Sequence, residues 1–252
     1  MNWMRALISW ELNRPLVVMT FFAGLVMGFI SVHSDYLSSY STVHVISSTV
    51  SVELSPFSLS GSAFWHVLKS LPRAGFSVYS FLVILLGTLI FRHDRDTGYA
   101  LTLYTLPYRK SKIFLAKLVS LLFLTVMMFY FPLFLSVFLS SATVAVHIPF
   151  ILDGAFLKTL ILITLALVYV ATLTAFLSMV LRGMFPTLIG SYLIVHISNA
   201  LGGGKLPPFS LFIRAMEINP SLLDSSVVLQ GIFLPLLLII LGVIASERRD
   251  VL

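Results

Sequence analysis

The 252-residue chain contains no cysteine, which excludes disulfides, iron–sulfur clusters and thiolate zinc sites. Charged residues are also scarce, at 10% of the chain, whereas a soluble globular protein carries about 25%. Hydrophobic residues make up 58%, and the mean hydropathy is +1.02. Most of the surface is therefore expected to face lipid, and nothing is left over for a separate soluble catalytic domain.

Sequence motifs of enzymes are missing as well. The chain has no H-E-x-x-H pair for zinc and no Gly-x-Ser-x-Gly nucleophile turn. The stretch GGGK, Gly202–Lys205, resembles part of a phosphate-binding loop, but Leu206 stands where such a loop has Ser or Thr. We interpret it as a flexible turn and expect no catalytic residue, metal site or cofactor in this chain.

Six apolar runs match the roughly 20 residues that a helix needs to cross a hydrocarbon core about 30 Å thick. They lie at 15–32, 74–91, 113–140, 155–181, 184–201 and 226–245. The sequence thus predicts an all-α polytopic membrane protein with six transmembrane helices, formed as a single domain over residues 1–252.

The segments outside these runs carry patterns of their own. Residues 1–14 place Trp3, Leu7 and Trp10 on one helical face, which is typical of a helix in the membrane interface; the alternative is an extension of the first span. The external loop 33–73 contains TVHVISSTVSVEL, whose alternation predicts a small hairpin. The external excursion 202–225 predicts a short helical cap, with one face formed by Phe209, Phe212, Ile213 and Met216.

Lys and Arg residues are distributed unevenly between the two sides of the predicted bundle. With the N-terminus in the cytoplasm, eleven of the sixteen lie in cytoplasmic segments and five in external ones. This bias predicts that both termini are cytoplasmic, in an integral multi-pass protein of the plasma membrane. It also accounts for the net charge of +6 without a nucleic-acid partner.

Polar residues interrupt the fifth apolar run, and glycines are spaced closely in the first. Ser191, His196 and Asn199 either line a translocation pathway or form hydrogen bonds between helices worth under about 1 kcal/mol. Gly24 and Gly28 form a G-x-x-x-G pair, which allows close helix contact.

The segment 93–112, between the second and third runs, has more pattern than a plain connection needs. Thr97 is placed to N-cap a short helix that begins at Gly98 or Tyr99, with Asp94 and Asp96 near its positive end. Pro107 stops that helix. The apolar residues between them follow helical spacing, so the helix has one side for the bundle and an aromatic side for a cytoplasmic partner.

This segment resembles the first cytoplasmic loop of ABC-2-type transporter permeases. That family's loop has an acid, Arg, an acid, a small residue and Gly, then Leu-Pro, a basic residue and a lysine entering the third span. The same order is found here in Asp94-Arg95-Asp96-Thr97-Gly98, an apolar turn, Leu106-Pro107, a basic pair and Lys117. The basic pair is Arg109-Lys110, and Ala116 stands where glycine often precedes the lysine. The six runs and the external excursion before the last one agree with the same family.

The resemblance implies the transmembrane permease subunit of an ATP-binding cassette exporter, which is not itself an enzyme. It implies a coupling helix in the cytoplasmic coupling loop 93–112, two cytoplasmic ATPase subunits that hold ATP and Mg, and a second permease, identical or related. The residues expected to contact the ATPase are Asp94, Asp96, Gly98, Tyr99, Leu103, Tyr104, Pro107, Arg109, Lys110 and Lys117. The alternatives are a self-contained secondary carrier or channel, for which the six runs lack a carboxylate, and an intramembrane enzyme.

Overall fold

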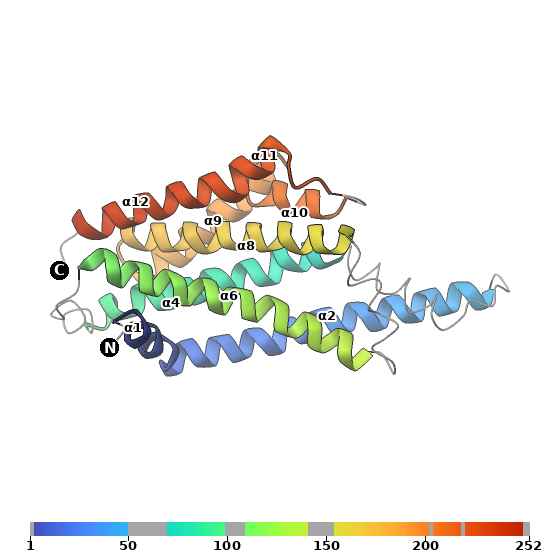
Figure 1. Ribbon diagram of the computed structural model, residues 1–252. Coiled ribbons are helices and arrows are strands. Elements are labelled where there is room, and N and C mark those ends of the chain that lie inside the picture. The colour runs from blue at the N-terminus through green and yellow to red at the C-terminus, as the bar shows by residue number, and fades with distance from the viewer. Residues whose placement is uncertain are drawn as a thin grey trace.

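The computed structural model describes residues 3–49, 70–98, 109–140, 154–201, 204–217 and 220–248. Within these ranges the chain is helical and has no strand. Six helices are long and apolar enough to cross a membrane: Pro15–Asp35, Ser70–Asp96, Lys110–Ser136, Gly154–Val180, Met184–Leu201 and Ser225–Arg248. They confirm the predicted all-α polytopic membrane protein, and their positions follow the six apolar runs (Figure 1).

The helices form an elongated bundle around α8 (Gly154–Val180), the yellow helix of Figure 1. It packs against α4 (Ser80–Asp96), α6 (Lys110–Ser140), α9 (Met184–Leu201) and α12 (Leu234–Arg248). In contrast, α2 (Pro15–Thr49) lies on the flank and packs mainly against α6 and α4. The flanking helices α2, α9 and α12 therefore expose long apolar faces, as lipid-facing helices do.

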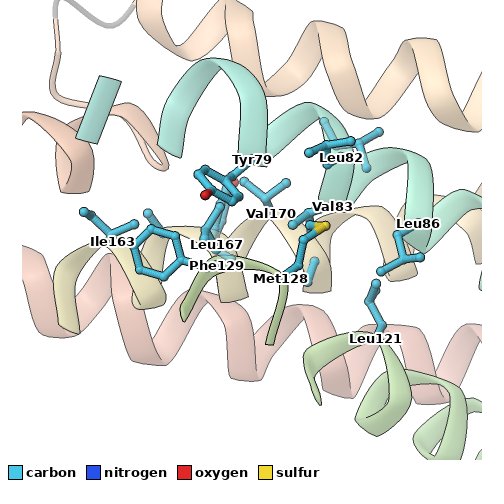
Figure 2. Close-up of a cluster of buried hydrophobic side chains, with 14 of the residues drawn as sticks. Tyr79, Leu82, Val83, Leu86, Leu121, Met128, Phe129, Ile163, Leu167 and Val170 are labelled. Atoms are coloured by element: carbon cyan, nitrogen blue, oxygen red, sulfur yellow. The ribbon is translucent and has the colours of Figure 1, made fainter. Parts of the chain in front are cut away.

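Glycines bring the flanking helices close to the core. A Cβ on Gly24 would lie 2.4 Å from Sδ of Met128, and one on Gly28 would lie 2.6 Å from the hydroxyl of Tyr79. Tyr79 and Met128 belong to the buried cluster in Figure 2, where the Tyr79 ring packs edge-on against Phe129. The G-x-x-x-G pair therefore lets α2 contact α6 and the first half of the second span, Ser70–Asp96.

The first span does not end where its apolar run ends. Helix α2 continues to Thr49, so the hairpin predicted from TVHVISSTVSVEL is wrong over residues 42–49; the rest of that stretch lies outside the described residues. An established helix adds one hydrogen bond for each further residue, and this gain outweighs the weak preference of β-branched residues for strands. The hydroxyls of Ser34 and Ser38 donate to carbonyls of the preceding turn, so these residues do not break the helix.

In the described part of the chain, two short helices lie outside the spans. Helix α1 (Trp3–Leu12) ends before Pro15, so it is a separate helix and not an extension of the first span. Helix α10 (Phe209–Ala215) confirms the predicted helix in the excursion 202–225, but the buried face is different. It contains Leu211, Phe212 and Ala215, while Ile213 points outward.

Candidate functional site

Four charged side chains, three on helices and one in the turn between α1 and α2, meet at the end of the bundle where α1 lies. This charge network consists of Glu11, Arg14, Asp94 and Lys117. Lys117 Nζ lies 3.1 Å from Glu11 Oε1 and 2.5 Å from Asp94 Oδ2. Arg14 pairs with Asp94 through Nη2 and lies 3.2 Å from Glu11 through Nη1. The network joins α1, the end of α4 and the start of α6.

Local structure explains how these residues meet. Leu7 packs with Ile113 and Ala116, which holds α1 against the first turns of α6. Glu11 follows Leu7 by four positions and therefore points to the same neighbour as Leu7. Lys117 also donates to the carbonyl of Ile90 at 2.7 Å, so its ammonium reaches the last turns of α4.

Burial makes this pairing obligatory. Only 2% of Glu11, 2% of Asp94 and 4% of Lys117 is exposed, and isolated charges cannot be buried to that extent without a large cost. Burial lowers the pKa of Arg14 from its ordinary value and Glu11 opposes this, but a guanidinium remains protonated at physiological pH. Two cations then balance two carboxylates. Removing one partner from such a buried pair typically costs about 3–5 kcal/mol.

The end of α4 carries further contacts. Arg92 pairs with Asp96 one turn later at 3.2 Å, and Arg95 donates to Sδ of Met179 on α8 at 3.3 Å. The predicted N-cap at Thr97 is wrong, because this residue closes the preceding helix. Its hydroxyl donates to the carbonyl of His93, and Gly98 leaves the helix with φ of +81°.

The residues expected to contact an ATPase fall into three groups. Asp96, Gly98 and Arg109 are exposed, and Lys110 is half-buried. Asp94 and Lys117 are buried in the charge network, so their charged groups face α1 and each other. The remaining four, and with them the predicted coupling helix, lie outside the described residues: Tyr99, Leu103, Tyr104 and Pro107.

The polar residues of the fifth span do not share one environment. Ser191 is buried, and its hydroxyl has no hydrogen-bond partner, while Asn199 is exposed. The His196 ring stacks on Tyr192 at 3.9 Å, and its Nδ1 lies 3.1 Å from the carbonyl of Tyr192 in the same helix. Its contact with the second span is a ring contact with Phe76 at 5.0 Å.

Sequence reasoning did not find Glu11 and Arg14. Glu11 stands four positions after Leu7, where an apolar residue would continue the buried face of α1, and Arg14 follows three positions later. This pattern points to both residues. Among the described residues, no group of three or more His, Asp or Glu side chains is placed to hold a metal ion. The charge network is therefore the strongest candidate for a functional site in this part of the chain.

Comparison with known proteins adds no assignment. No protein-family model matches the chain, and no curated protein or solved structure matches it significantly.

Proposed function

We propose that this chain is the membrane-spanning permease subunit of an ATP-driven exporter of the ABC-2 type. Two copies, or one copy and a related chain, would form the substrate pathway, and two separate cytoplasmic ATPase subunits would supply the energy. The support comes from the six membrane-spanning helices, the resemblance of segment 93–117 to the coupling loop of that family, and the charge network.

The charge network is the observation that carries this proposal. Asp94 and Lys117 belong to the segment on which the resemblance rests, and they lie on either side of residues 99–108. Through Arg14 and Glu11 they are joined to α1, which leads directly into α2 at Pro15. A displacement applied to this segment by an ATPase would therefore move α4, α6 and the start of α2 together.

Co-purification with a candidate P-loop ATPase tests the proposal. We expect capture of the ATPase and stimulation of its hydrolysis in lipid discs. Replacing residues 99–106 with a Gly-Ser segment should abolish capture, and Tyr104→Ala should weaken it by about 1–3 kcal/mol if the ring is an interface anchor. Capture and stimulation at wild-type levels by both variants would refute the proposal.

A variant of the charge network separates coupling from binding. Asp94→Asn removes the ion pair between Arg14 and α4, so the start of α2 should follow α4 less closely. The contact between Glu11 and Lys117 still joins α1 to α6. We expect normal capture of the ATPase and reduced stimulation of hydrolysis. Asp35→Asn, a matched change on α2 far from the network, should leave both properties unchanged.

A second candidate is an ion-coupled carrier that works without an ATPase. The buried carboxylates of Glu11 and Asp94 beside Lys117 favour it, because carriers of this kind use buried ionisable groups. Liposomes that contain this chain alone distinguish the two candidates. A carrier moves a screened compound in response to a proton gradient, whereas the permease needs the ATPase and ATP.

A further inference from the structure

A cavity of about 570 Å³ opens beside the elbow between α1 and α2. Trp10, Asn13 and Arg14 line it from the α1 side, Val17 from α2, and Leu89 and His93 from α4. The two α4 residues are four positions apart and lie on the same face of the helix. Its volume falls in the range of about 300–1,000 Å³ that is typical of small-ligand sites.

The polar side of the cavity offers hydrogen-bond donors. The guanidinium of Arg14 has five N–H groups, and its contacts with Asp94 and Glu11 do not use all of them. The Trp10 ring covers one face of the Arg14 guanidinium, and the ring centroid lies 4.1 Å from Cζ. Asn13 and His93 add an amide and an imidazole. The acidic lining residue, Asp94, already accepts from Arg14 and Lys117.

The apolar side continues into an exposed strip along α2. Leu16 lines the cavity and is half-exposed, and Met19, Ala23 and Val26 follow it at helical spacing on the exposed side. From Leu16 to Val26 the strip rises about 15 Å, which is half of a hydrocarbon core about 30 Å thick. The donor-rich pocket matches the phosphate region of a phospholipid, and the strip, which is one leaflet deep, matches an acyl chain.

We propose that this cavity binds the phosphate and glycerol region of an anionic phospholipid from the leaflet at the α1 end, with an acyl chain along the α2 strip. The lipid phosphate accepts from Arg14, Asn13 and His93, as phosphates do from clustered donors. Since Arg14 belongs to the charge network, the bound lipid stabilises the elbow between α1 and α2. This site does not depend on the transport proposal, because it needs neither an ATPase nor a second permease.

The test uses the purified, delipidated full chain and measures its thermal unfolding in mixed micelles. Phosphatidylglycerol should raise the unfolding temperature saturably, with one lipid retained per chain in native mass spectra. Phosphatidylcholine should do so at a half-saturating concentration about tenfold higher or more. Glycerol 3-phosphate and inorganic phosphate, which lack an acyl chain, should have no effect.

Two variants locate the site without removing a member of the charge network. Asn13→Leu combined with His93→Leu removes two donors and should abolish the preference for phosphatidylglycerol. Leu16→Trp fills the mouth of the cavity and should abolish retention of the lipid, whereas Leu236→Trp, on an equally exposed position of α12, should not. The proposal would be overturned by a preference for phosphatidylglycerol that survives the first variant, or by lipid retention that survives Leu16→Trp. A dimer of this chain that covers the cavity and excludes lipid would also overturn it.

Discussion

The hydroxyl of Tyr79 is buried without a hydrogen-bond partner, directly against the backbone of Gly28. A Cβ at position 28 would lie 2.6 Å from this oxygen and 3.1 Å from two ring carbons. Tyr79 cannot move away easily, because its ring is fully buried and packs edge-on against Phe129. The close approach of α2 to the second span therefore depends on one missing methyl group.

We predict that Gly28→Ala destabilises the fold by about 1–3 kcal/mol, the usual cost of overpacking. Tyr79→Phe should be neutral or stabilising, because it removes an unpaired buried hydroxyl. In the double variant the alanine should cost less than in the wild type, since its closest contact is gone. Reversible unfolding in detergent measures all three. Gly154→Ala is the control, because a Cβ at that position has nothing within 4 Å. Additive effects of Gly28→Ala and Tyr79→Phe would contradict this account.

At the scale of elements, side-chain contacts hold α10 to the start of the last span. Arg214 of α10 pairs with Asp224, which also N-caps α11 (Ser225–Val228) by accepting from the Ser226 backbone at 3.3 Å. In the π-helical turn that follows α11 (Leu229–Phe233), Gln230 accepts from Ser210 and donates to the carbonyl of Lys205 at 3.0 Å. The cap thus rests on contacts between residues that are distant in sequence.

We predict that the Arg214–Asp224 contact stabilises the cap at neutral pH and not in acid. The hydrogen bond from Arg214, followed by that from the Ser226 backbone, holds the pKa of Asp224 below its ordinary value of 3.8. A lowered folded-state pKa means that the stabilisation is complete above about pH 4 and lost as the pH falls through the folded value. Thermal unfolding should therefore separate the wild type from Asp224→Asn at pH 7, and the difference should shrink towards pH 3. A difference that is unchanged at pH 3 would argue against the ion pair.

The sequence predicted the elements far better than the contacts between them. Apolar length alone located all six spans, and the fifth helix begins and ends at the predicted residues, Met184 and Leu201. The end of α2 was missed, because a helix continues past its apolar run when neighbouring residues tolerate it. The partners of Asp94 and Lys117 were missed for another reason: Glu11 and Arg14 are brought to them only by the packing of α1 on α6.

At the scale of the whole molecule, the two ends of the bundle differ in charge. Helix α1 and the end of α12 lie at the same end in Figure 1, and α10 and α11 lie at the opposite end, as six crossings require. The charge network and the basic ends of α4 and α6 also lie at the α1 end. Most of the Lys and Arg residues in the described ranges thus lie at the α1 end of the bundle.

We predict that the α1 end faces the cytoplasm. Lys and Arg resist transfer across the membrane, so the end that carries more of them is retained inside. A reporter active only in the cytoplasm should work when it is fused after Leu252, and one active only outside should work when it is inserted near Ser58. Exchanging the two reporters should silence both, which controls for expression.

Replacing Arg109, Lys110 and Lys112 with Gln removes three cations from the α1 end and should give a fraction of chains with mixed orientation, since the bias falls from eleven-to-five to eight-to-five. External activity of the wild-type fusion at Leu252 would overturn the orientation while leaving the six helices in place.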